Sequence, residues 1–205
     1  MSSPISPEEI RQRYETVRDE VGPAVTVVVA TKYVTVAELA MVAEAGVEVI
    51  GENRAQDLAA KHEIYGTAFT WHFIGHLQSR KAKTVNELCT LCHSLDSESA
   101  AGKLTIPALV EVNLSGEATK SGVAPEDLAA FLELCPTARG LMTLPPWSDD
   151  PEASRPYFVR LRELAEKHGL RELSMGTSQD WRVAVEEGAT HIRVGSSIFG
   201  DRRPQ

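Results

Sequence analysis

Lys32 is the residue best placed in this sequence to attack a carbonyl group. It directly follows Val25 to Thr31 (VTVVVAT), a nearly continuous β-branched run that predicts a strand buried on both faces. Side chains alternate along a strand, so Val28, Ala30 and Lys32 share one face. If that face lines a barrel, the amine is partly desolvated, which favours its neutral form and Schiff-base chemistry. A snorkelling or ion-paired lysine at a strand end is the alternative interpretation.

Two short turns rich in glycine and serine follow the last two apolar runs. They are Ser174 to Ser178 (SMGTS) and Gly195 to Ser197 (GSS). Glycine lets backbone N–H groups approach an anion, and the hydroxyl groups add hydrogen-bond donors. In barrel proteins, the loops after strands seven and eight often hold phosphate. The two turns therefore predict a phosphate site, with ordinary turn chemistry as the alternative.

Arg193 shares a face of the last predicted strand with His191 and Gly195. An arginine inside a barrel is costly unless it meets an anion or a hydrogen-bond acceptor. A structural ion pair with an interior carboxylate such as Glu111 is the alternative. A lysine, a phosphate cradle and an inward arginine together describe a site for pyridoxal 5′-phosphate (PLP), with the arginine at its ring nitrogen.

The rest of the chain alternates strand and helix patterns around these residues. It opens with a helix at about 7–21, for which Ser6 and Glu9 supply a capping box and Pro7 the first position. Eight apolar runs follow, each separated from the next by a helical pattern, and we expect no helix after the last. The runs are 25–31, 47–50, 70–74, 91–95, 106–114, 140–144, 173–175 and 191–199.

Eight parallel strands close a (β/α)8 TIM barrel, so the sequence predicts an α/β protein with one domain over 1–205 and a barrel over about 25–200. An open doubly wound sheet is the alternative. It would be supported by a Gly-rich turn after the first strand, but the chain reads Ala30-Thr31-Lys32 there. Residues 97–105 leave room for at most about two helical turns, so the crossover before the fifth strand is expected to be short.

Composition and charge argue against several classes of protein. The chain has 21 Lys and Arg against 29 Asp and Glu, and this net charge of −8 disfavours nucleic-acid binding. Three cysteines are too few for a disulfide framework, and the polar N-terminus lacks the apolar segment of a signal peptide. The apolar runs are far shorter than the ~18 residues that span a bilayer. We therefore expect a cytoplasmic protein that binds neither nucleic acid nor membranes.

Several segments closely resemble the pyridoxal 5′-phosphate homeostasis proteins, which are relatives of the barrel domain of alanine racemase. These segments are ATK (30–32), GEN (51–53), WHFIGHLQSRK (71–81), HSLDS (93–97), EVNLSGEATKSGV (111–123), GLMTLPP (140–146), SMGTSQD (174–180) and RVGSSIFG (193–200). The resemblance runs from about residue 7 to residue 202 and implies the type III fold of PLP proteins. It also implies a monomeric carrier that buffers PLP and supplies apo enzymes, with no established catalytic turnover.

The resemblance assigns a Schiff base with PLP to Lys32. The other implied contacts are the phosphate at Ser178, Gly195 and Ser196, the pyridine nitrogen at Arg193, and the pocket wall at Asn53 and Met175. Lys120 corresponds to a lysine linked to cofactor exchange. Many relatives carry a second lysine two residues after the Schiff-base lysine, and this chain has Val34 there. An amino-acid racemase-like PLP enzyme and a Schiff-base aldolase for phosphorylated sugars are the alternative functions.

Three other patterns have ordinary structural interpretations. Cys89 and Cys92 form a single pair, for which core packing is favoured over zinc or redox chemistry. His72 and His76 straddle a strand end, which favours local hydrogen bonds over a metal site. The basic run at 80–83 is interpreted as a solvated helix face, with an RNA or partner contact as the alternative.

Overall fold

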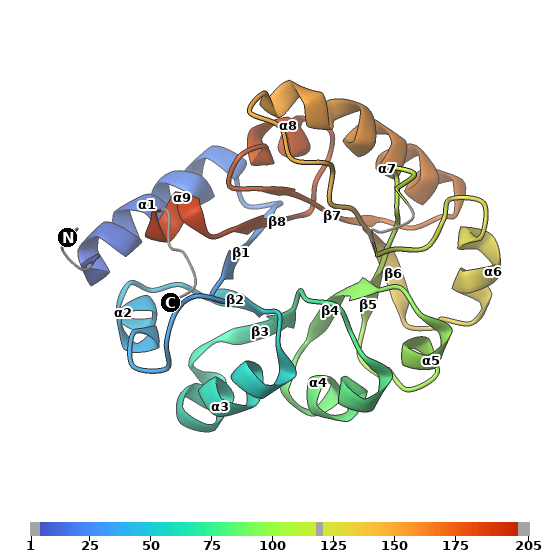
Figure 1. Ribbon diagram of the computed structural model, residues 1–205. Coiled ribbons are helices and arrows are strands. Elements are labelled where there is room, and N and C mark those ends of the chain that lie inside the picture. The colour runs from blue at the N-terminus through green and yellow to red at the C-terminus, as the bar shows by residue number, and fades with distance from the viewer. Residues whose placement is uncertain (1–4, 118–120, 201–205) are drawn as a thin grey trace.

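The structure is a computed structural model that describes residues 5–117 and 121–200. Figure 1 shows a central ring of strands with helices around it. The strands are β1 (Thr26–Ala30), β2 (Val49–Glu52), β3 (Thr70–Phe73), β4 (Leu91–Leu95), β5 (Ala108–Glu111), β6 (Ala138–Met142), β7 (Glu172–Thr177) and β8 (His191–Val194). All neighbouring strands are parallel and β1 pairs with β8, which closes the barrel. The predicted barrel is therefore confirmed, and the open sheet is wrong.

Helices surround the barrel on the outside. They are α1 (Pro7–Val21), α2 (Leu39–Glu44), α3 (Ala55–Tyr65), α4 (Ala82–Leu88), α5 (Glu98–Ala101), α6 (Leu128–Glu133), α7 (Arg155–Lys167), α8 (Trp181–Glu186) and α9 (Ser196–Phe199). Short 3-10 turns lie at Gly66–Ala68, Ser79–Lys81 and Pro151–Ser154. Among the described helices, none is long and apolar enough to cross a membrane.

Helix α1 precedes the barrel and starts with the predicted capping box. Ser6 Oγ accepts a hydrogen bond from the Glu9 N–H at 3.2 Å, and Glu9 Oε2 accepts one from the Ser6 N–H at 2.9 Å. Ile10 and Tyr14 are buried on the inner face of α1. This helix contacts α2 and α9 and lies beside α9 in Figure 1. Helix α1 therefore supports α9 at the barrel mouth.

Several strand boundaries differ from the prediction. The last strand ends at Val194, because the backbone leaves the extended conformation at Gly195 and the chain enters α9. The expectation that no helix follows this strand is therefore wrong. β2 extends to Glu52 instead of residue 50, which places Asn53 just beyond the carboxyl edge of the sheet. The crossover before β5 is short as predicted, since α5 is a single turn.

The inside of the barrel is polar on one side. Val28 is in register with Arg193, so both side chains point inward, and the predicted alternation along β1 is confirmed. The rings of His72, His93 and His191 lie 5.0 to 6.0 Å apart between their centroids. The layer between strands and helices is apolar, with Val29 as one fully enclosed example. The core of this fold is therefore outside the strands, and polar groups occupy part of the interior.

Candidate ligand site at the barrel mouth

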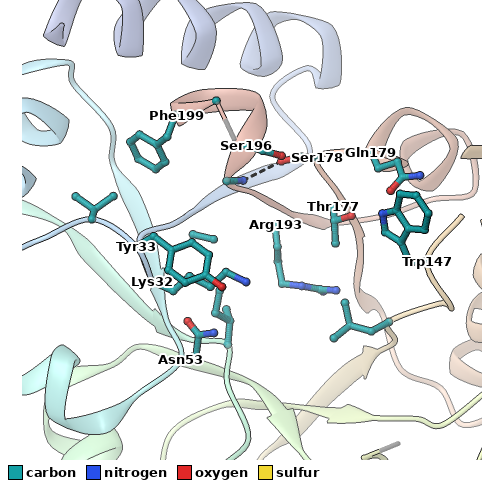
Figure 2. A pocket seen from close by; sticks show the side chains of 16 residues that line it. Lys32, Tyr33, Asn53, Trp147, Thr177, Ser178, Gln179, Arg193, Ser196 and Phe199 are labelled. Carbon is teal, nitrogen blue, oxygen red and sulfur yellow. Dashed lines mark hydrogen bonds between the residues drawn. The ribbon is translucent and has the colours of Figure 1, made fainter. Parts of the chain in front are cut away.

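A cavity of about 720 Å³ lies at the carboxyl ends of β1, β2, β7 and β8. Its volume is within the range of small-molecule sites. Figure 2 shows its polar side chains facing a common space. The lining residues are Ala30, Lys32, Tyr33, Val34, Asn53, Ile74, Leu144, Trp147, Thr177, Ser178, Gln179, Arg193, Gly195, Ser196, Phe199 and Gly200. The cavity thus includes six of the seven residues that the sequence assigned to a cofactor.

Lys32 lies in the turn after β1, on the wall of the cavity (Figure 2). Its side chain is exposed, so the desolvation expected from the sequence is not present. Nζ lies 4.8 Å from the centroid of the Tyr33 ring, a cation–π distance. Thr31 and Val34 on either side of this pair are buried, which anchors the turn. The amine therefore reaches the cavity from a fixed backbone while water still has access to it.

A buried ion pair lies directly behind this turn. Lys61 Nζ donates to Glu52 Oε1 at 2.5 Å and to the Thr31 carbonyl oxygen at 2.8 Å. The Thr31 hydroxyl also donates to Glu52 Oε1. Burial raises the pKa of Glu52, and the nearby Lys61 ammonium opposes that shift. The pair ties α3 and β2 to the backbone next to Lys32, and sequence reasoning missed it although Lys61 lies on the buried side of α3.

Asn53 follows β2 and lines the cavity, and its side-chain oxygen is a buried, unsatisfied acceptor. Among the described residues, no group donates a hydrogen bond to its buried Oδ1 atom. Unpaired buried acceptors are uncommon and costly, so the surroundings must hold this side chain in place. Gly75 packs against the Asn53 backbone so closely that a Cβ there would lie 2.2 Å from the Asn53 carbonyl oxygen. The glycine in the segment WHFIGHLQ therefore determines where Asn53 lies.

Ser178 joins the loops that follow β7 and β8. Its Oγ accepts hydrogen bonds from the N–H groups of Gly195 and Ser197, each at 3.0 Å. Ser197 Oγ donates in return to the Ser178 carbonyl oxygen at 3.2 Å. The Ser178 hydroxyl proton is not used in the two bonds that its oxygen accepts, so it can be donated to an anion. The loops after β7 and β8 therefore meet at the cavity, and the phosphate contact stays a prediction.

The carboxylate of Asp180 fixes the start of the first of these loops. Its Oδ1 accepts from the Thr177 N–H at 2.7 Å and from the Thr177 hydroxyl at 3.1 Å. Its Oδ2 accepts from Ser154 Oγ at 2.7 Å. The donors of the loop are thus held in place before any ligand arrives, which lowers the entropic cost of binding.

Arg193 forms the buried floor of the cavity. Its guanidinium donates to Ser174 Oγ and to the Thr143 carbonyl oxygen, the latter at 3.1 Å. The ion pair with Glu111 is absent from the described residues; Glu111 Oε1 instead accepts from Ser121 Oγ at 2.8 Å. Desolvation lowers the pKa of Arg193 to about 10, so the group stays cationic near neutral pH. Neutral acceptors therefore hold this arginine, and its charge is available to a ligand.

The described lining of the cavity does not include two of the predicted residues. Met175 is fully buried and is outside the described lining of the cavity, so its contact with a cofactor stays a prediction. Lys120 lies outside the described residues. Tyr33 and Trp147 line the cavity although the sequence analysis did not select them. Their positions in the sequence could have identified them, since each aromatic residue lies in a loop that follows a strand.

The three cysteines are buried free thiols, which confirms the core-packing interpretation for Cys89 and Cys92. Burial raises the pKa of both thiols, that of Cys92 to about 11, so they stay protonated. His76 Nδ1 lies 3.3 Å from Asp96 Oδ2, a local contact as expected. The described residues contain no group of three His, Cys, Asp or Glu side chains suited to a metal ion.

The fold and the cavity define a (β/α)8 barrel with a small-molecule site at the carboxyl ends of its strands. The family model for the N-terminal domain of alanine racemase matches residues 5–203. An alanine racemase from Clostridium difficile 630 shares this fold, with a TM-score of 0.76 at 13% identity over all of this chain and 60% of that chain.

Relatives with higher sequence identity specify the family to which the chain belongs. The pyridoxal phosphate homeostasis protein of Aquifex aeolicus is 42% identical over 77% of this chain and 78% of its own length. That of Pseudomonas aeruginosa is 40% identical over 77% and 76%. PipY of Synechococcus elongatus PCC7942, solved with PLP bound, is 34% identical, with a TM-score of 0.81 over 93% of this chain and 100% of that one. The chain belongs to the pyridoxal phosphate homeostasis protein family.

Proposed function

We propose that this protein binds PLP in the cavity at the barrel mouth and acts as a carrier that buffers PLP in the cell. The observation that carries the proposal is the meeting in one cavity of the Lys32 amine, the Arg193 guanidinium and the loops joined by Ser178 (Figure 2). When bound, PLP supplies an aldehyde that an amine can hold covalently. The relatives named for PLP homeostasis and the PLP-bound PipY structure support the same ligand.

Each polar group of the cavity has a separate task in this proposal. The Lys32 amine would hold the aldehyde of PLP covalently. The turn of Ser178, Gly195 and Ser196 surrounds the phosphate, with the Ser178 hydroxyl proton as a donor, because the Gly195 N–H is already paired with Ser178 Oγ. The Asn53 side chain lies against the ring. Four independent contacts then fix the orientation of the ligand, with Arg193 at the ring nitrogen.

Arg193 favours storage of PLP over turnover. A guanidinium that stays protonated donates a hydrogen bond to the ring nitrogen and leaves that nitrogen without a proton of its own. A ring in this state withdraws electrons weakly, so carbanion chemistry on it would depend on a separate strong base. The geometry of the cavity therefore supports a carrier, with a racemase-like enzyme as the alternative that experiments must test.

The first experiment is a PLP titration followed by visible absorbance, borohydride reduction and peptide mass analysis. We expect a trapped adduct on Lys32 that disappears in Lys32→Ala. Lys83→Ala is the matched control, because Lys83 is an exposed lysine on α4 away from the cavity. Absence of an adduct on Lys32 would contradict the proposal, and an adduct that forms only with a phosphorylated sugar would favour an aldolase.

A second experiment separates the carrier from the enzyme. The PLP-loaded protein is incubated with alanine or serine in heavy water, and the α-hydrogen is followed by NMR. Retention of the hydrogen over many hours supports a carrier, because a racemase must remove it in every turnover. Rapid exchange that depends on Lys32 would overturn the carrier assignment in favour of a racemase-like enzyme.

We also propose that the loaded protein is a cytoplasmic monomer that supplies apo enzymes. Its three free thiols fit a reducing compartment. Recovery of activity in an apo PLP enzyme is compared between the loaded protein and the same concentration of free PLP. Faster recovery with the loaded protein supports direct delivery, and equal recovery indicates release into solvent. Light scattering gives the oligomeric state, and cell fractionation tests the compartment.

A further inference from the structure

A chain of hydrogen bonds crosses the barrel interior beneath the cavity. It starts at Arg193, whose guanidinium donates to Ser174 Oγ. Ser174 Oγ lies 2.7 Å from His93 Nδ1, and His93 Nε2 lies 2.9 Å from His72 Nδ1. All four side chains are buried, and they come from β8, β7, β4 and β3. The chain therefore links the cationic floor of the cavity to the opposite side of the barrel.

The positions of the protons in this hydrogen-bond chain follow from Arg193, its first member. A guanidinium has donors and no acceptor, so Ser174 Oγ accepts from Arg193. Within the described residues, the hydrogen bonds of Ser174 Oγ go to Arg193 and His93, so its own proton is donated to His93 Nδ1. His93 then carries its proton on Nε2 and donates it to His72 Nδ1. Each member donates to the next, and both imidazoles are neutral.

The surroundings keep the imidazoles neutral. The His191 ring meets the His93 ring edge to face, with centroids 5.3 Å apart. Burial lowers the pKa of His72 to about 3 and that of His93 well below its usual value, with the Arg193 charge contributing at His93. A proton on His93 Nδ1 would remove the only acceptor for the Ser174 hydroxyl proton among the described residues. The neutral chain is thus the arrangement in which the Ser174 hydroxyl and His93 Nε2 both have an acceptor.

We propose that His93 is a positioning residue for the PLP site. Through Ser174, it fixes the orientation in which the Arg193 guanidinium meets the ring nitrogen of the bound ligand. Arg193 has a second acceptor, the Thr143 carbonyl oxygen. This single hydrogen bond does not fix the plane of the guanidinium when Ser174 is free to rotate. This inference rests on the proposed function, because it assigns His93 a task at the same PLP site.

Two substitutions at His93 separate its two hydrogen bonds. The Oδ1 atom of asparagine lies at the same number of bonds from Cβ as His93 Nδ1, so His93→Asn keeps an acceptor for Ser174. The side-chain amide of glutamine extends one bond further, to the position of Nε2, so His93→Gln keeps the contact with His72 and loses the one with Ser174. Both variants carry a side-chain amide, which reaches Ser174 in His93→Asn and His72 in His93→Gln.

The experiment measures PLP affinity and the absorption maximum of bound PLP for the wild-type protein and both variants. We expect His93→Asn to bind within about twofold of wild type, and His93→Gln to bind about tenfold more weakly with a shifted maximum. In an Arg193→Leu background, His93→Gln is expected to change neither quantity further, because its effect acts through the arginine. Ser174→Ala is expected to behave like His93→Gln and serves if that variant fails to fold.

The outcomes distinguish this inference from the proposed function. If wild type forms no adduct with PLP at Lys32, the proposed function fails first. If wild type binds PLP and folded His93→Gln and Ser174→Ala bind it equally well with an unchanged maximum, the positioning role is overturned. An equal loss from His93→Gln in the wild-type and Arg193→Leu backgrounds would also overturn it, since the effect would then be independent of Arg193.

Discussion

Lys61 Nζ lies 2.5 Å from Glu52 Oε1 in a buried ion pair, and the same ammonium donates to the Thr31 carbonyl oxygen. Removing one member of such a pair leaves an uncompensated charge or an unsatisfied polar group in the interior. Lys61→Met is therefore expected to lower the free energy of unfolding by about 3 kcal/mol. Urea unfolding followed by circular dichroism measures this change.

A double variant tests whether the loss arises from the unpaired carboxylate. Glu52→Gln combined with Lys61→Met removes both charges, so it is expected to be more stable than Lys61→Met alone. Both variants release the backbone next to Lys32 from its anchor. We expect them to bind PLP more weakly than wild type even at temperatures where they are folded. Equal stability of the two variants would show that the charge of Glu52 is not the source of the loss.

Ser178→Ala is expected to discriminate between phosphorylated and unphosphorylated ligands. The Ser178 hydroxyl is the group that can donate to a phosphate oxygen while its own oxygen joins the loops after β7 and β8. We expect about tenfold weaker binding of PLP and an affinity for pyridoxal, which lacks the phosphate, within about twofold of wild type. Fluorescence titration with both ligands measures this, and Ser99→Ala on α5 is an exposed control. An equal loss for both ligands would argue against a phosphate contact.

The barrel itself was predictable because its signals are local. β-branched runs such as 25–31 and a capping box such as that of Ser6 and Glu9 specify strands and helices from neighbouring residues alone. The meeting of Ser178 with Gly195 was also predictable once eight strands were counted, because loops seven and eight are adjacent in a closed barrel. The end of β8 was predicted incorrectly because the apolar residues of α9 continue the pattern of the strand.

The supporting contacts of the site depend on tertiary packing, and the sequence offers weaker signals for them. The bond from Lys61 to Thr31 joins residues 30 positions apart, and the one from His93 to Ser174 joins residues 81 apart. Local periodicity carries no information on such pairs. The exposure of Lys32 was likewise not predictable, because it depends on how the turn after β1 leaves the strand and not on the face that alternation assigns.

Gly75→Ala is expected to damage the cavity through Asn53. A Cβ at position 75 would lie 2.2 Å from the Asn53 carbonyl oxygen and 2.5 Å from its Cα, so the Asn53 backbone must move. We expect PLP affinity to fall at least about tenfold and the free energy of unfolding to fall by about 1–3 kcal/mol. Gly102→Ala is the control, because its nearest atom is 3.6 Å away. Unchanged affinity in Gly75→Ala would show that Asn53 does not contact the ligand.

The buried histidines predict a loss of stability in mild acid. In the folded state the pKa of His72 is lowered to about 3 and that of His191 to about 4, mainly by desolvation, and that of His93 lies well below its usual value. Above a pH of about 6.5, both folded and unfolded chains hold these imidazoles neutral. As the pH falls toward about 4, only the unfolded chain takes up protons, so the free energy of unfolding decreases.

Each such proton lowers the free energy of unfolding by up to about 1.4 kcal/mol per pH unit. Glu52 and Glu111 reduce this loss, because burial raises their pKa and the folded state retains their protons to higher pH. Urea unfolding at pH 7.5 and pH 5 measures the net effect. His191→Gln removes one of the three imidazoles and is expected to reduce the pH dependence by about a third. Equal stability of the wild-type protein at both pH values would mean that the three rings are not held neutral.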